Sequence, residues 1–313
     1  MPYALHHMAL TPEAYLRPDV IKQVERFDLK AKFLMEGFLA GLHSSPHKGF
    51  SVEFSEHRKY VHGDDYRTID WKVWSRTNRY YIKQYEAETN LTGYLLVDGS
   101  GSMAYRGPTI KGVENASMSK LEYATCLAGA MAYLMSSQQD PVGLITFGTE
   151  IQTVLKPKSK ASNLLSMLRV LAQLQPHGPT GLAKCLHQIA EYIPHRGLVM
   201  IFSDFLDDEP AMIDALAHLR YRGHDVIAFQ IFSAAETLFP FTDTMRFEDI
   251  EGVEQAIVTA PAAIREGYLK ELKNFLERMS TECRKRRIDW LNINTGMSFE
   301  KALMTYLMHR CSK

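Results

Sequence analysis

The chain has 313 residues, of which 46% are hydrophobic and 23% are charged, so it can bury a full core and form one large domain with a smaller attachment. Its 36 basic and 36 acidic side chains cancel, which excludes an overall field that would draw it to nucleic acid or an anionic membrane. No apolar stretch approaches the roughly 20 residues that span a bilayer, and the N-terminus lacks a signal peptide's basic end and apolar core, so we expect a cytoplasmic protein with neither a membrane nor a nucleic-acid partner.

The first 90 residues read as a helix followed by a smaller β-rich element. Apolar residues at near-helical spacing predict a helix over Pro18–Ala40. The runs GFSVEF and RYYIKQYEAE alternate in the manner of antiparallel strands, and the polar passage SEHRKYVHGDDYRTIDWKVWSRT lies between them. We interpret that passage as a salt-bridge and stacking lattice that fastens this element to the main sheet, in preference to a recognition surface. The lattice residues are Asp64, Asp65, Arg67, Asp70, Trp71, Lys72, Trp74 and Arg76.

From residue 91 onward, short apolar segments alternate with helical patterns. The expected strands are LTGYLLVD, VGLITFG, IQTVL, GLVMIFSDF, DVIAFQIF and IDWLNINT. The expected helices are Ser119–Gln138, Ser162–Leu174, Gly181–Tyr192, Pro210–Tyr221, Ala262–Arg286 and a last one from Ser298. Strands that are apolar at nearly every position and alternate with helices predict a mainly parallel sheet covered on both faces. We therefore predict an α/β, doubly wound fold, with an N-terminal part over residues 1–90 and the main domain over residues 91–313.

The segment LLVDGSGSMAY contains the end of the first strand of the main domain and the residues that follow it. Ligands of such sheets bind beyond the carboxyl ends of the strands. Gly99, Gly101 and Ala104 fit the dinucleotide fingerprint G-x-G-x-x-A. Asp98 would repel a pyrophosphate, and the next helix begins about fifteen residues later, whereas the fingerprint needs a helix N-terminus at once. The spacing also differs from the G-x-S-x-G of a nucleophile elbow. We therefore set aside nucleotide binding and acyl transfer for this segment.

A divalent metal ion suits the same segment better. Asp98, Ser100 and Ser102 place oxygen donors on one turn, which provides half of a site for a hard cation. Two further donors are available: Thr180 in the glycine-bearing turn of HGPTGLAKCL, ahead of a helix, and Asp204 at the end of the expected strand GLVMIFSDF. These two carboxylates and three hydroxyls leave one coordination position for a group from outside. We predict a Mg²⁺ site at these residues, with Mn²⁺ and Ca²⁺ left open.

In residue type and order, these donors resemble the metal-ion-dependent adhesion site of the von Willebrand factor A fold. Upstream, F-S-E-x-R-x-Y lies at Phe54–Tyr60, G-D-D-x-R-x-I-D-W at Gly63–Trp71 and S-R-T at Ser75–Thr77. These motifs resemble the signature of a bacterial branch of that fold, domain of unknown function 58 (DUF58). The resemblance covers roughly Gly41–Ile231.

The resemblance implies a role for each donor and a class of partner. Ser100 and Ser102 would bind the ion directly, Thr180 would bind it in the partner-bound state, and Asp98 and Asp204 would act directly or through water. An acidic side chain of a protein partner would complete the shell, since neutral hydroxyls leave the ion short of negative charge. Members of the family are often encoded beside MoxR-type AAA+ ATPases, so such an ATPase is the expected partner.

We expect an interaction protein that is not an enzyme. The alternative is a metal-dependent phosphoester hydrolase, because a divalent ion in an α/β crevice can activate water. Such chemistry needs a general base or a second metal, and His177, three residues before Thr180, is the histidine nearest to the expected donors in the sequence. Asp208 is expected to cap the helix that follows it, and Arg284–Arg287 to form a solvated helix end.

Overall fold

The computed structural model describes residues 52–61, 69–87, 91–110, 113, 118–248, 250–251, 257–299 and 301–302. The chain divides into two compact units, one over Leu39–Asn90 and the other made of the rest of the chain. The expected helix over Pro18–Ala40 and the lattice residues Asp64, Asp65 and Arg67 lie outside the described residues. Within the described part of the chain, no helix has both the length and the apolar character needed to cross a membrane.

In the smaller unit, an antiparallel strand pair is joined to a short helix. Strand β1 (Val52–Lys59) pairs with β2 (Tyr81–Ala87). Helix α2 (Trp71–Thr77) begins after Asp70, whose carboxylate accepts hydrogen bonds from the N–H groups of Lys72 and Val73. The end of β1 and all of α2 lie within the polar passage, where the sequence pattern predicts neither element. Asp70 acts as the N-cap that starts this helix.

Aromatic rings pack within the smaller unit. The rings of Trp74 and Tyr80 are stacked with centroids 6.2 Å apart, and Trp71 meets Trp74 edge to face at 6.0 Å. Trp71 is nevertheless 57% exposed, so part of this surface faces solvent. The expected role of the passage in fastening the two units together stays a prediction.

The larger unit is built around a six-stranded sheet in the order β10-β7-β6-β3-β4-β5. Neighbouring strands are parallel except for β4 and β5, which are antiparallel. This arrangement confirms the expected α/β, doubly wound, mainly parallel sheet. In chain order the strands are β3 (Gly93–Asp98), β4 (Val142–Phe147), β5 (Ile151–Lys158), β6 (Leu198–Ser203), β7 (Asp225–Phe232) and β10 (Asp289–Asn294).

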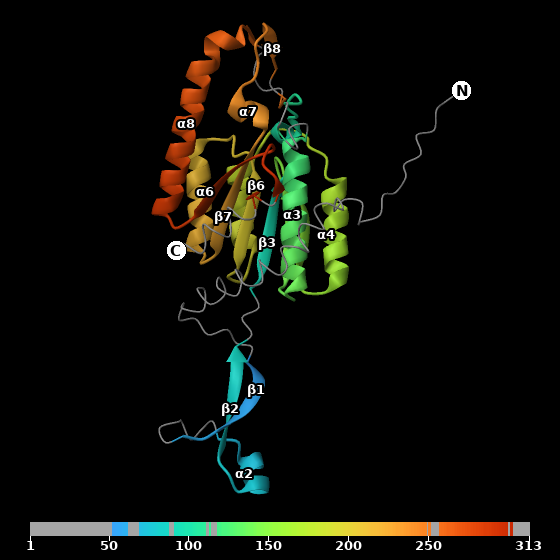
Figure 1. The fold of residues 1–313 in the computed structure, drawn as a ribbon, viewed down its shortest axis with the longest axis vertical. Coiled ribbons are helices and arrows are strands. Elements are labelled where there is room, and N and C mark those ends of the chain that lie inside the picture. The colour runs from blue at the N-terminus through green and yellow to red at the C-terminus, as the bar shows by residue number, and fades with distance from the viewer. Residues whose placement is uncertain are drawn as a thin grey trace, which may run out of the picture. The chain divides into compact units, whose positions relative to one another are not determined.

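Helices cover both faces of this sheet, as Figure 1 shows, with α3 and α4 on one side and α6 and α8 on the other. Their bounds are α3 (Lys120–Ser137), α4 (Ala161–Gln173), α5 (Leu182–Tyr192), α6 (Glu209–Tyr221) and α8 (Pro261–Lys285). The expected N-cap of α6 is confirmed, because Asp208 accepts a hydrogen bond from the N–H of Ala211 at 3.0 Å. Shorter elements lie near the site described below: the 3₁₀ helix η3 (Gly101–Ala104), helix α7 (Ala234–Leu238) and a hairpin of β8 (Met245–Phe247) and β9 (Ile257–Thr259).

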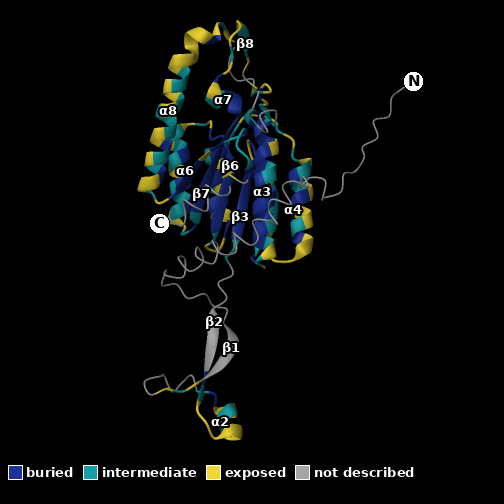
Figure 2. Cartoon of the chain, in the orientation of Figure 1, coloured by how far each residue is buried: buried dark blue, intermediate teal, exposed yellow. Residues whose placement is uncertain are grey.

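The core forms where apolar strand residues meet these helices. On the face covered by α5, α6 and α8, sheet residues such as Leu96 and Ile201 pack with Leu186, Leu216 and Met279, all of them fully buried. The central strands β3 and β6 are buried along their whole length, so their side chains face protein on both sides (Figure 2). Two rigid strands therefore carry the residues that follow them to one edge of the sheet.

Candidate metal centre

The candidate site lies where strand order reverses. Along the chain, β3 is followed by β4 on one of its sides, whereas the later strand β6 pairs with its other side. The parallel register aligns Val97 of β3 with Phe202 of β6, so both strands end at the same edge. Asp98 is the last residue of β3, and Asp204 comes directly after β6. This edge is the position at which open α/β sheets bind ligands.

Two hydrogen bonds fix the carboxylate of Asp98, which has no exposed surface. Its Oδ1 accepts from the N–H of Ser100 at 2.8 Å, and its Oδ2 accepts from the hydroxyl of Ser203 at 2.6 Å. Burial, together with repulsion from Asp204, raises the pKa of Asp98 to about 7, although the bonds from Ser203 and Ser100 act in the opposite direction. The carboxylate is therefore held in one orientation at a place where negative charge is costly.

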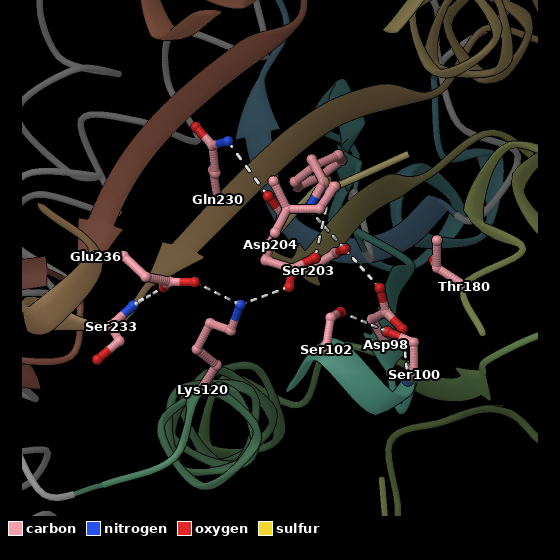
Figure 3. A network of polar contacts seen from close by, with 12 residues as sticks. Asp98, Ser100, Ser102, Lys120, Thr180, Ser203, Asp204, Gln230, Ser233 and Glu236 are labelled. Carbon is pink, nitrogen blue, oxygen red and sulfur yellow. Dashed lines mark hydrogen bonds and ion pairs between the residues drawn. The ribbon is translucent and has the colours of Figure 1, made fainter. Parts of the chain in front are cut away.

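Two serine hydroxyls lie side by side at the start of η3. The Oγ atoms of Ser100 and Ser102 are 3.2 Å apart (Figure 3). Two oxygen atoms that bind one Mg²⁺ at right angles, each at about 2.1 Å, lie roughly 3 Å from each other. The spacing of the hydroxyls thus fits adjacent positions around a small hard cation.

Asp204 is buried to the same degree as Asp98 but has a cationic partner. The ammonium of Lys120 lies 2.7 Å from Oδ2 of Asp204 and 3.0 Å from Oε1 of Glu236, and Figure 3 shows it between the two carboxylates. Burial alone would lower the pKa of Lys120, but the charges of Asp204 and Glu236 and the hydrogen bonds to them raise it overall. Oδ1 of Asp204 accepts a bond from the N–H of Leu206 and keeps a second lone pair. Asp204 can therefore serve an ion through Oδ1, directly or by way of a water molecule.

The loop that carries Thr180 is bound to the loop after β3. The N–H of Gly101 donates to the carbonyl of Gly178 at 2.8 Å, and the N–H of His177 donates to the carbonyl of Gly99 at 3.0 Å. A Cβ atom at Gly101 would lie 2.9 Å from the Gly178 oxygen, so the close approach of the loops requires a glycine there. The hydrogen bond of Gly101 also occupies an amide that a phosphate would need.

A carboxylate of the chain itself lies between these two loops. Glu251, in the connection between β8 and β9, accepts hydrogen bonds from the N–H of Ser102 at 3.3 Å and from the N–H of Thr180 at 3.0 Å. The two amides belong to the residues whose hydroxyls are expected metal ligands. Glu251 thus joins the two halves of the predicted site.

The structure brings the predicted donors together to different degrees. Asp98, Ser100 and Ser102 are connected directly, Thr180 is connected to Ser102 through Glu251, and Asp204 follows the strand next to Asp98. Their service as metal ligands stays a prediction. Among the described residues, no group of three or more histidine, cysteine, aspartate or glutamate side chains could hold a metal ion.

The sequence reasoning missed four residues of this network: Lys120, Ser203, Glu236 and Glu251. Ser203 could have been found, because a hydroxyl directly before Asp204 lies at the same strand end. Lys120 had a weaker signal, since it directly follows Ser119, which with Glu122 forms the capping box of α3, and so lies in the first turn beside the expected site. His177, the candidate base, is exposed and contributes its backbone N–H to the loop contact.

Comparison with known proteins gives one family and several similar chains. The family described as "Protein of unknown function DUF58" matches residues 56–277. The uncharacterized protein Rv1480 of Mycobacterium tuberculosis is 27% identical over 252 residues, which are 78% of this chain and 75% of the relative. The conserved hypothetical protein BatB from Bacteroides thetaiotaomicron is similar in structure, with a TM-score of 0.44 and 16% identity over 71% of this chain and 100% of that one. The SpRpn10 VWA domain gives a TM-score of 0.39 and 13% identity over 70% of this chain and 95% of that one.

Proposed function

We propose that this chain, which belongs to the family described as "Protein of unknown function DUF58", is a non-catalytic interaction protein that binds a protein partner through a divalent cation. The cation is Mg²⁺, or Mn²⁺ or Ca²⁺ in its place. Asp98, Ser100, Ser102, Thr180 and Asp204 hold it at the carboxyl ends of β3 and β6. When bound, the ion supplies an open coordination position that favours an anionic oxygen of the partner.

The observation that carries this proposal is the pair of serine hydroxyls beside two buried carboxylates. The hydroxyls of Ser100 and Ser102 are 3.2 Å apart, a separation that suits two ligands of one ion. Asp98 and Asp204 are 0% and 1% exposed. Lys120 contacts Asp204 and Glu236 and balances the charge of one carboxylate, so a divalent cation would offset the negative charge that remains.

The partner we propose is a protein that presents a glutamate or aspartate side chain, with a MoxR-type AAA+ ATPase as the first candidate. The chemistry of the donors supports the acidic side chain, since three of the five donors are neutral hydroxyls. The resemblance of the upstream motifs to DUF58 proteins supports the choice of ATPase.

Metal binding tests the first half of the proposal. The EDTA-treated protein is titrated with Mn²⁺, and electron paramagnetic resonance measures the free ion at each step. The difference between added and free Mn²⁺ should show one bound ion per chain. We expect Ser102→Ala to weaken binding at least tenfold, because the substitution removes one of the proposed ligands. The side chain of Ser102 is half-buried, so its hydroxyl can be removed with little harm to folding. Ser166→Ala, an exposed serine on α4, is the matched control and should bind as the wild type does. Equal binding by all three proteins would refute the site.

Capture of the partner tests the second half. Tagged wild-type protein and Ser102→Ala are incubated with lysate of the native organism in Mg²⁺ and, separately, in EDTA. A protein held by the wild type in Mg²⁺ and lost in the other conditions is the partner that we propose. Proteins that stay bound regardless of metal and mutation would place the interface elsewhere on the molecule.

A further inference from the structure

The position of Glu251 relative to the proposed ion site carries an inference about regulation. Its carboxylate accepts from the backbone N–H groups of Ser102 and Thr180, which lie on opposite loops of the site. The packing is close, since a Cβ atom at Gly101 would lie 3.4 Å from Cγ of Glu251. A carboxylate of this chain therefore lies between the two loops that an acidic side chain of a partner would have to enter.

We propose that Glu251 is an internal ligand of the site, which occupies in cis the position of the partner's acidic side chain and must leave before the partner binds. The inference rests on the proposed function, because it assigns a regulatory residue to the same site. The chemistry agrees: the site is expected to bind one external carboxylate, and Glu251 brings a carboxylate from the β8–β9 connection to the two loops that carry Ser102 and Thr180.

The hairpin that carries Glu251 is attached in a way that allows its release. Strands β8 and β9 are three residues each, and Ile257 and Val258 of β9 are 62% and 68% exposed. Phe247, at the end of β8, stacks on Phe239 with centroids 6.2 Å apart and packs edge to face against Phe241 at 5.9 Å. Phe247 therefore anchors the end of β8 from which the connection that carries Glu251 begins. Segments with so little buried area open at low free-energy cost without global unfolding.

An external ligand can bind only to the molecules in which the internal ligand has left the site. Its apparent affinity is therefore the intrinsic affinity multiplied by the fraction of open molecules. If Glu251 occupies the site in about 90% of molecules, a partner's carboxylate binds roughly tenfold more weakly than it would to an open site. The effective concentration of a tethered group on a short connection is in the millimolar range, so it competes with single carboxylates of millimolar affinity. A partner with further contacts would still displace it.

The test measures Mn²⁺ binding and the water that remains on the bound ion, in the full chain. Wild type is compared with Glu251→Gln, which removes the charge, and with Glu251→Asp, which keeps the charge but shortens the side chain. Glu248→Gln is the control, because Glu248 lies on the same hairpin, is 66% exposed and pairs with Arg246. Water-proton relaxation reports the water on bound Mn²⁺, and N-acetylglutamate amide is added as the carboxylate probe.

We expect Glu251→Gln and Glu251→Asp to raise the relaxation enhancement of bound Mn²⁺, because water replaces the internal carboxylate. The probe should lower the enhancement in both variants, with an apparent affinity at least tenfold higher than in the wild type or in Glu248→Gln. If Mn²⁺ binds to all four proteins with the same enhancement and the same response to the probe, Glu251 is not an internal ligand, although the metal site stands. If Mn²⁺ does not bind to the wild type, the proposed function and this inference both fail.

Discussion

At the scale of single residues, Lys120 sets the charge balance of the network beside the site. Its ammonium contacts Asp204 and Glu236, and its side chain is 1% exposed, as is that of Asp204. Breaking a buried ion pair by removing one partner leaves a charge without compensation, and this costs far more than the loss of an exposed pair. Lys120 therefore matters more to stability than the exposed lysines of the same domain.

Replacement of Lys120 by methionine should destabilise the metal-free protein by about 3–5 kcal/mol, because Asp204 and Glu236 lose their cation. Lys184→Met is the matched control, since Lys184 is 58% exposed and lies 3.6 Å from an exposed Glu150, and its effect should stay within about 0.5 kcal/mol. Urea unfolding in EDTA measures both. A loss below about 1 kcal/mol for Lys120→Met would contradict the assigned role.

Asp140, which precedes β4, gives the stability of the protein a pH dependence. Oδ1 accepts a bond from the N–H of Leu91 at 3.3 Å, whereas Oδ2 is buried and has no hydrogen-bond partner among the described residues. Burial raises the pKa of Asp140 from 3.8 to about 6, with the bond from Leu91 acting in the opposite direction. The folded state therefore keeps this proton to a higher pH than the unfolded state, so stability falls as the pH rises from about 4 to above 6.

Asp140→Asn should remove the loss of stability that Asp140 causes as the pH rises, since asparagine is neutral at every pH in the range. At pH 7 we expect the variant to be more stable than the wild type by on the order of 1–3 kcal/mol, and at pH 4 the difference should vanish. Asp243→Asn, at an exposed position, should show no such pH-dependent gain. The measurement is urea unfolding at pH 4, 5, 6 and 7. A constant difference across the range would show that Asp140 does not titrate as argued.

At the scale of elements, the buried strands could be predicted and the small polar elements could not. β3, β6 and β7 are apolar at almost every position, and such runs have few other structural interpretations. β5 extends to Lys158, beyond the expected IQTVL, because an edge strand tolerates Pro157 and exposed lysines that a sequence pattern counts as a stop. Helix α2 has seven residues, too few for a helical repeat to emerge from its charged surroundings.

The candidate site was predictable to the extent that it depends on strand ends. Parallel strands bring their carboxyl ends to one edge, so Asp98 and Asp204 could be placed together from the strand pattern. Lys120 lies 84 residues before Asp204 in the sequence, and Glu251 lies 149 residues after Ser102. No local pattern marks a lysine for a buried ion pair or a loop glutamate for two distant amides, because these contacts arise from tertiary packing.

At the scale of the whole molecule, the site and its support belong to one unit. The six-stranded sheet runs from β3 to β10, and the buried cluster on one of its faces extends from Tyr94 to Trp290. Every hydrogen bond described for the site joins residues between Asp98 and Glu251. The smaller unit over Leu39–Asn90 packs its own aromatic residues.

A fragment of residues 91–313 should therefore fold and bind Mn²⁺ within about twofold of the full chain, since it contains the sheet, the helices on both faces and every predicted donor. Circular dichroism on heating tests folding, and calorimetric titration with Mn²⁺ compares the fragment with the full chain. A folded fragment that binds Mn²⁺ more than tenfold more weakly would show that residues before 91 complete the site. A folded fragment that keeps the metal but no longer captures the partner would instead assign recognition to the preceding residues, among which Trp71 presents an exposed aromatic surface.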